Sequence, residues 1–207
     1  MAFEFIQIAD DLLSFKIAAS IERTNLAAKL RTLSGIDECV EGMETITLQF
    51  DPLSTDITAL KSKIADLETQ ITNQSAPLQD VITIPIIYNE TTGPDLKHVC
   101  EALGLSVDDF IQQHTSQIYK VDLIGFTPGF AYIGGAAFDI PRLKEPRVKV
   151  EAGSVGLTSG YTGIYALEGP GGWPIIGRTT KKLFDPDQQD PFILSPHMRV
   201  KFEAVSP

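Results

Sequence analysis

Glycine and proline crowd into the second half of this chain, and that crowding limits what the chain can fold into. Most of its 16 glycines and 13 prolines lie beyond residue 80, in runs such as GSVG at 153–156 and GPGGWPIIG at 169–177. Glycine adopts turn conformations that other residues avoid, and proline can continue neither a helix nor a central strand. We therefore expect short strands joined by tight turns in most of this half.

The stretch VDLIGFTPGFAY at residues 121–132 organises that half. It opens as an apolar strand that carries one carboxylate, Asp122, and it then breaks at a turn rich in glycine and proline. Loops on a rigid scaffold commonly bind ligands, although aromatic residues beside a turn also serve as core. If the turn binds a small ligand, the apolar wall is made by Phe126, Pro128, Gly129, Phe130 and Tyr132.

Composition narrows the classes of partner. The formal net charge is -10, from 27 acidic and 17 scattered basic residues, which argues against binding to nucleic acid or to an anionic membrane. The longest uncharged run, residues 123–138, is too short and too rich in glycine and proline to span a bilayer. The N-terminus lacks the pattern of a signal peptide, and Cys39 and Cys100 form no CxxC motif. We expect two buried free thiols and a cytoplasmic location.

The first 77 residues predict a small domain of their own. Strands are expected at 3–8 and 12–18, a helix from Ser20 to a stop at Gly35, and a hairpin over 36–50. Residues 57–71 carry the clearest helical period, with an apolar stripe on one face. Helices on one face of an antiparallel sheet make a two-layer α/β unit, and the polar stretch 72–79 is the expected linker.

Residues 78–207 predict a second, mostly β domain. A strand at 81–88 carries Pro85, which indicates either a sheet edge or a β-bulge. Two short helices follow at 95–103 and 107–113, the second opened by a capping-box pattern of Ser106 and Asp109. Strands and turns fill the rest, so the overall class is α+β and the second domain is expected to be a closed β-barrel.

Histidines, one serine and one arginine are the candidate chemical groups. His114 could act as acid, base or hydrogen-bond donor, or could be a satisfied structural histidine; His98 and His197 have no partner spacing, so no metal site is predicted. The run before Arg178 nearly spells a phosphate-binding loop, but Pro174 has no N–H to offer a phosphate. Arg178 could still hold an anion. Ser154 lacks a GxSxG elbow, so a structural turn is expected there.

Further polar residues in this half would orient a ligand if the fold brings them together. They are Asp122, Arg142, Arg147, Thr162 and Tyr165.

A long ordered set of motifs gives the chain a family resemblance. Residues 81–202 resemble the family of 5-oxoprolinase B-type subunits, also called allophanate hydrolase subunit 1, which includes an inhibitor of a sporulation histidine kinase. The motifs that carry it are GPDL at 93–96, His114, GFTPGFAYIGG at 125–135, PR at 141–142 and 146–147, GSVG at 153–156, TGIY at 162–165, PGGW at 170–173, IGRT at 176–179 and LFDP at 183–186.

The resemblance implies a cyclophilin-like barrel and a role inside a larger enzyme. Such an enzyme uses ATP to open the lactam of 5-oxoproline to glutamate. Its partners would be a homologous C-type subunit, of the allophanate hydrolase subunit 2 type, and an A-type subunit. The chain alone is expected to be inactive. The resemblance makes His114 a proton donor or acceptor and Arg147 and Arg178 anion clamps. It places the substrate, a small molecule, against Phe126, Pro128, Gly129, Phe130, Tyr132, Thr162, Tyr165 and Trp173.

Two other functions stay open. The chain could be a regulatory protein that inhibits a histidine kinase by binding to it, or subunit 1 of an amidase similar to allophanate hydrolase. Trp173 is expected either at an interface, where tryptophan is enriched, or inside the barrel.

Overall fold

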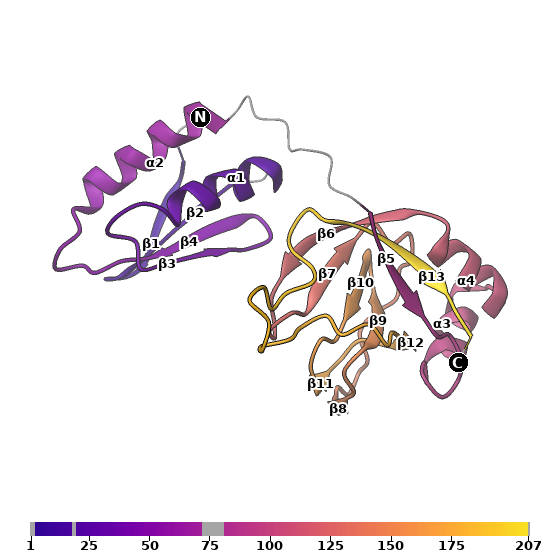
Figure 1. The fold of residues 1–207 in the computed structure, drawn as a ribbon. Helices are drawn as coiled ribbons and strands as arrows, with labels where there is room; N and C mark the ends of the chain where they lie inside the picture. Colours follow the sequence, from indigo (N-terminus) through magenta and orange to yellow (C-terminus); the bar gives the residue numbers. More distant parts are fainter. Residues whose placement is uncertain (1–2, 18–19, 72–80, 207) are drawn as a thin grey trace. The chain divides into compact units, whose positions relative to one another are not determined.

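The computed structural model describes residues 3–17, 20–71 and 81–206. The chain forms two compact units, Met1–Leu78 and Gln79–Pro207 (Figure 1). The expected linker at 72–79 lies outside the described residues. Among the residues described, no helix is long and apolar enough to cross a membrane.

The first unit is a four-stranded antiparallel sheet packed against two helices. Its strands are ordered β1-β2-β4-β3. Alternate residues such as Leu13, Phe15, Ile46 and Leu48 are buried against the helices, because successive side chains of a strand point to opposite faces. The elements are β1 (Phe5–Ala9), β2 (Leu12–Lys16), α1 (Ser20–Leu30), β3 (Glu38–Glu41), β4 (Thr45–Gln49) and α2 (Ile57–Ile71).

Sequence patterns located these elements well, with one difference. The predicted helix at 57–71 is confirmed, but α1 ends at Leu30, earlier than the expected stop at Gly35. Beyond Leu30 the backbone tightens, since Thr32 N donates to Lys29 O and Leu33 N donates to Leu30 O. Gly35 keeps the expected left-handed conformation, with φ of 90°.

The second unit contains a seven-stranded sheet that closes almost completely on itself. Its order is β12-β9-β10-β7-β6-β13-β5, and only β5 and β13 pair in parallel. The two ends of the sheet meet where Ile87 N donates to Arg178 O at 2.8 Å and Arg178 N donates to Ile87 O at 3.1 Å. The α+β class and the barrel are thereby confirmed. The strands are β5 (Val81–Ile86), β6 (Ile118–Ile124), β7 (Ala131–Gly134), β9 (Ser154–Thr158), β10 (Tyr161–Ile164), β12 (Ile175–Arg178) and β13 (Arg199–Ala204).

Two short helices and a ribbon complete this unit. Helix α3 (Leu96–Leu103) ends at left-handed Gly104, and α4 (Val107–Thr115) begins at Ser106, whose Oγ accepts a hydrogen bond from Asp109 N at 3.1 Å. The capping box is therefore confirmed. Strands β8 (Arg147–Val150) and β11 (Gly169–Gly171) pair as a separate two-stranded ribbon.

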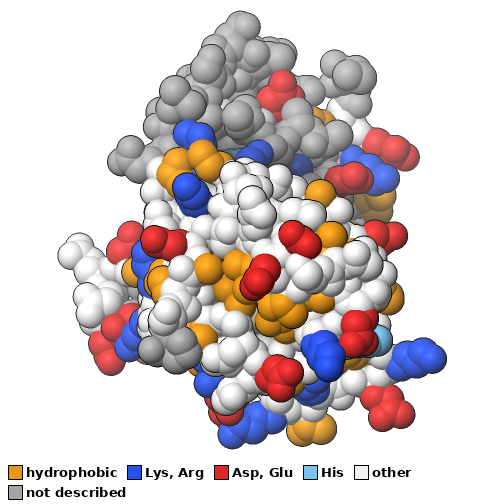
Figure 2. Space-filling view, turned by 90° about the vertical axis from the view of Figure 1, so that its right-hand side faces the viewer, with side chains coloured by type: hydrophobic (Ala, Val, Ile, Leu, Met, Phe, Trp, Pro, Cys, Tyr) orange, Lys and Arg blue, Asp and Glu red, His pale blue; other side chains and the backbone are white. Residues whose placement is uncertain are grey.

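Apolar side chains from every strand of the barrel sheet, together with α3 and α4, fill the interior. Among them are Val121, Ile133, Leu157 and Phe202, each with no exposed surface. Figure 2 views the side that carries α3 and α4 in Figure 1; hydrophobic side chains gather in its middle and basic side chains are interspersed with acidic ones.

Cys39 and Cys100 are buried and free, as predicted.

Candidate functional site

A second apolar layer covers the outer face of the barrel, opposite the interior core. Its centre is Phe130, Val150, Tyr165, Trp173 and Ile175, all buried. Six rings join edge to face with neighbouring centroids 4.9–6.4 Å apart, an arrangement that aromatic pairs prefer. We call these six residues the aromatic cluster: Phe126, Phe130, Tyr132, Tyr161, Tyr165 and Trp173.

Glycines at outward-facing strand positions form the floor under these rings. Gly163 lies opposite Tyr132 on β7 and opposite Gly156 on β9. A Cβ on Gly163 would lie 2.6 Å from both Phe130 Cζ and Trp173 Cζ3, and one on Gly156 would lie 3.0 Å from Trp173 Cβ. A side chain at either position would displace the rings, so these glycines are required by close packing and not by turn geometry.

The turn between β6 and β7 presents one ring of the cluster to solvent. Phe126 has φ of 69° and Gly129 has φ of 76°, and Phe130 N donates to Thr127 O at 3.0 Å. A left-handed conformation is unusual for a bulky residue and often marks a functional segment. Phe126 is 62% exposed, while Phe130 beside it is buried. The turn therefore forms a rim, as expected from GFTPGF, with Phe126 at its tip.

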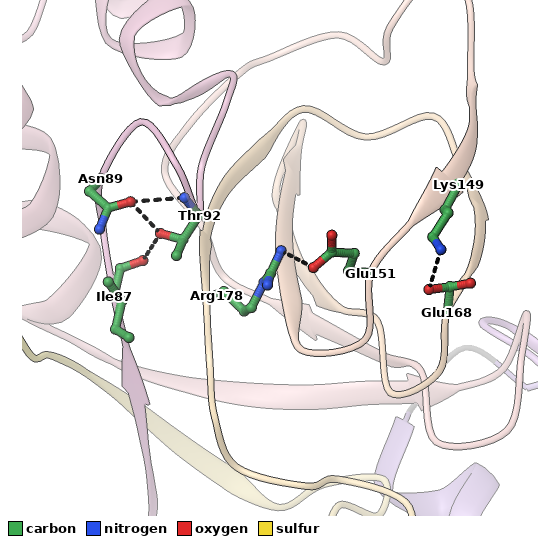
Figure 3. A network of polar contacts seen from close by, with 7 residues as sticks. All are labelled: Ile87, Asn89, Thr92, Lys149, Glu151, Glu168 and Arg178. Atoms are coloured by element: carbon green, nitrogen blue, oxygen red, sulfur yellow. Dashed lines mark hydrogen bonds and ion pairs between the residues drawn. The ribbon is translucent and has the colours of Figure 1, made fainter. Parts of the chain in front are cut away.

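A row of ion pairs lines one side of the ribbon, and two of them join it to other elements of the unit. Arg147, Lys149 and Glu151 alternate along β8 and its end, so they share one side of the strand. Lys149 pairs with Glu168 at 2.9 Å, and Glu151 pairs with Arg178 at 2.5 Å (Figure 3). The pair of Glu151 and Arg178 lies next to the turn that follows Ile87. Arg178 is thus engaged by an acid of its own chain.

Asp95 anchors the third pair. Its Oδ1 accepts from Arg147 Nη2 at 2.8 Å, and its Oδ2 contacts Arg147 Nη1 at 2.8 Å and accepts from Ile175 N at 2.7 Å. Asp95 thereby joins the start of α3 to β8 and β12, the strands next to Trp173. Sequence reasoning noted Asp95 only within the GPDL motif and gave it no role, because a proline-preceded helix start gives no sign of a partner 52 positions away.

The hydroxyl group of Tyr165 lies at the end of the cluster that is near Arg142 and Arg147. Burial raises the pKa of Tyr165, and the nearby guanidinium groups of Arg142 and Arg147 act in the opposite direction. A Cβ on Gly171 would lie 2.4 Å from this hydroxyl oxygen, so the ribbon backbone passes directly over it. This end of the cluster combines a phenol with exposed Arg142 and with Arg147, whose charge is already paired with Asp95.

A cavity of about 140 Å³ lies on another side of Tyr165. Gly153, Thr179, Lys181 and Lys182 are among its lining residues. Lys182 is paired with Asp185 at 2.9 Å, and Lys181 Nζ donates to Thr83 O at 3.2 Å. The two lysines are therefore already engaged within the chain.

His114 lies in the barrel interior and not in the aromatic cluster. It has no exposed surface, and its ring stacks on Phe202 at 4.6 Å and on Phe110 at 5.7 Å. Its Nδ1 is 2.6 Å from Tyr88 Oη and its Nε2 is 2.9 Å from Thr162 Oγ1. Burial lowers the pKa of His114 to about 3 and raises that of Tyr88, so both side chains are neutral. A neutral imidazole has one N–H donor and one acceptor nitrogen, so His114 donates to one of the two hydroxyl groups and accepts from the other.

The fold brings only part of the predicted set together. Thr162 points inward to His114, whereas its neighbour Gly163 faces the cluster. Arg147 borders the cluster through the ribbon. Trp173 is 5% exposed and belongs to the outer cluster, not to the barrel interior. The predicted residues found on or beside the outer face are Phe126, Pro128, Gly129, Phe130, Tyr132, Tyr165 and Trp173.

Within the described part of the chain, no group of three or more His, Cys, Asp or Glu side chains could hold a metal ion.

Comparisons with known proteins identify the family. The family model described as "Carboxyltransferase domain, subdomain C and D" matches residues 3–194. The B subunit of 5-oxoprolinase from Escherichia coli O157:H7 is 37% identical over 180 residues, 86% of this chain and 82% of that protein. The corresponding B subunit from Bacillus subtilis strain 168 is 32% identical, over 83% of this chain and 77% of its own length. The chain belongs to this carboxyltransferase-domain family together with the 5-oxoprolinase B subunits, which confirms the resemblance found in its motifs.

Solved structures agree. The structure of TTHA0988 superposes with a TM-score of 0.81 at 30% identity and matches 95% of this chain. This chain spans only 40% of that longer protein. The urea carboxylase of Kluyveromyces lactis has a TM-score of 0.75 at 17% identity, over 99% of this chain, and so shares the fold.

Replacing Gly163 by alanine tests the glycine floor. The new methyl group would displace Phe130 or Trp173, and we expect the free energy of unfolding to fall by about 1–3 kcal/mol. Trp173 is the only tryptophan, so its emission should move to longer wavelength and become more accessible to a soluble quencher. Gly169→Ala is the control, because no atom lies within 4 Å of its added Cβ. If Gly163→Ala kept the emission and the stability of wild type, the claim that the rings pack directly on the backbone at Gly163 would be wrong.

The second prediction concerns the pH dependence of stability. The folded pKa of His114 is about 3, below the ordinary value of 6.5. Between about pH 3 and pH 6.5 the folded state therefore binds fewer protons than the unfolded chain. The stabilisation from neutral His114 is complete above about pH 6.5 and is lost as the pH falls toward about 3. Between pH 7 and pH 5, wild type should lose about 2 kcal/mol more than His114→Gln.

Urea unfolding followed by Trp173 fluorescence measures this difference. Nitrogen NMR of the ring gives an independent readout, which should show one protonated ring nitrogen and no titration between pH 5 and 8. Equal losses of stability in the two proteins, or a ring that titrates near pH 6.5, would rule out the buried neutral assignment.

Proposed function

We propose that this chain is the B subunit of an ATP-dependent 5-oxoprolinase that opens the lactam of 5-oxoproline to give glutamate. The observation that carries the proposal is the similarity to named 5-oxoprolinase B subunits along most of both chains. An amide is a poor electrophile. Transfer of the γ-phosphoryl group of ATP to the lactam oxygen would make the lactam carbon electrophilic enough for water to attack it. Water adds to this carbon, the C–N bond breaks as the nitrogen takes a proton, and a second water cleaves the resulting acyl phosphate to glutamate and phosphate.

In this proposal the aromatic cluster is the substrate face. The five-membered ring of 5-oxoproline is mostly hydrocarbon and would lie against the cluster near Phe126 and Tyr132, the parts that reach solvent. The substrate is also a carboxylate. Arg147 uses its two terminal nitrogens on Asp95, so its role as an anion clamp is shared with exposed Arg142. Arg178 would act mainly by holding the ribbon through Glu151.

His114 is assigned a positioning role. A fully buried ring between Tyr88 and Thr162 reaches a ligand only through Thr162, on strand β10. The same strand carries Tyr161 and Gly163 on its outer side. His114 would therefore fix the height and tilt of β10, and with it the floor under the cluster.

The remaining catalytic groups are assigned to partner subunits. The relatives are named as one lettered subunit, and this chain spans 40% of the longer TTHA0988. We propose two partners, a C-type subunit of the allophanate hydrolase subunit 2 type and an A-type subunit, which act with ATP in the cytoplasm. The aromatic cluster and its exposed Phe126 would close against one of them.

Reconstitution tests this function. The purified chain mixed with its partner subunits, ATP and 5-oxoproline should release glutamate and ADP in equal amounts, while the chain alone should release neither. Phe126→Ala should raise KM by about tenfold or more, since burying a phenylalanine side chain on binding is worth about 1.5–3 kcal/mol. Phe192→Ala is the control, because Phe192 is another exposed ring of the same unit. No turnover from the full set of subunits would refute the assignment.

A further inference from the structure

Asp122 is placed on the outer face of the barrel by an irregularity in the sheet. Val121 pairs with Ile133 and Leu123 pairs with Tyr132, so Asp122 is an extra residue on β6 at a β-bulge. Such a bulge re-aims a side chain and is frequent beside functional sites. Here it directs a carboxylate out of the barrel wall, since Val121 beside it is wholly buried in the interior.

Gly134 makes room for this carboxylate. A Cβ on Gly134 would lie 2.1 Å from Asp122 Oδ2, so the carboxylate lies flat against the backbone of β7. Any other residue at 134 would push it away. Glycine at this position is therefore explained by Asp122, just as Gly163 is explained by the rings.

Tyr161 stands on the other side of the same glycine. It pairs with Gly134 across the sheet, and its Cε1 would lie 3.4 Å from the same Cβ position. Burial and the charge of Asp122 both raise the pKa of Tyr161, so its hydroxyl keeps its proton. Tyr161 also meets Tyr132 edge to face at 6.4 Å. A carboxylate and a phenol thus stand together at one end of the aromatic cluster.

We propose that Asp122 and Tyr161 form a subsite for the amide edge of a cyclic amide. A lactam is held cis, so its N–H donor and its C=O acceptor lie side by side along one edge. An ionised carboxylate only accepts and has room for several donors, while a protonated phenol can donate. Asp122 would accept the lactam N–H, and Tyr161 would donate to the lactam oxygen. This subsite rests on the proposed function, and it specifies that this end of the cluster recognises the amide group of the substrate.

Two ligands and four variants, one of them a control, test the subsite. The full complex without ATP is titrated by calorimetry with 5-oxoproline and with the lactone analogue, in which a ring oxygen replaces the N–H. Wild type should prefer the lactam by roughly tenfold or more, because a hydrogen bond to a charged group is lost in the lactone. Asp122→Ala should weaken lactam binding and reduce the preference to about twofold or less. Tyr161→Phe should weaken both ligands by a similar factor, because both keep the C=O.

Asp190→Ala, an exposed acid of the same unit, is the matched control and should behave as wild type. Unchanged Trp173 emission verifies that Asp122→Ala is folded, and Asp122→Asn, which keeps the size of the side chain, should show an intermediate preference. A wild-type preference retained in Asp122→Ala would overturn the subsite while leaving the enzyme assignment intact. A complex that neither binds nor turns over 5-oxoproline would instead overturn the proposed function, and this ligand assignment with it.

Discussion

The outer site depends on the close approach of aromatic rings to a strand backbone. Six rings lie over one face of the barrel because Gly156 and Gly163 expose backbone where other residues would raise a side chain. The register of the sheet matters as much as the glycines. It sets Tyr132, Gly163, Gly156 and Ile175 in one row across four strands, all on the outer side. A change of register would therefore disrupt the aromatic cluster, the glycines beneath it and the packing of Trp173 at the same time.

The interior of the barrel holds that register in place. The bridge between Ile87 and Arg178 brings the two ends of the sheet together, and Tyr88, the next residue, binds His114. His114 then binds Thr162 at the middle of the sheet. Neutral partners suit this position, because an ionised group without a charged partner would be costly in such a buried place. On the outside, the hydrogen bonds of Asp95 to Arg147 and to Ile175 N bind the ribbon to β12.

Local patterns were readable from the sequence, and long-range placement was not. The apolar stripe at 57–71, the capping box at Ser106 and the edge strand with Pro85 depend on neighbours within a few residues, and all three were found correctly. The rim at GFTPGF followed in the same way. Thr162 and Gly163 must face opposite sides of their strand, but which of them faces the interior depends on contacts with distant segments, so the sequence could not assign it. The bulge at Asp122 and the pairing of Asp95 with Arg147 depend on contacts between distant segments.

The five tyrosines provide the most direct test that ligand binds the outer face. Tyr88 and Tyr119 line the interior, whereas Tyr132, Tyr161 and Tyr165 belong to the aromatic cluster. With carbon-13 in the tyrosine rings, the chain can be bound to unlabelled partner subunits and titrated with 5-oxoproline. The resonances of Tyr132 and Tyr161 should shift in a saturable way, while those of Tyr88 and Tyr119 stay in place. Saturable shifts confined to Tyr88 and Tyr119 would put the ligand inside the barrel and contradict this account.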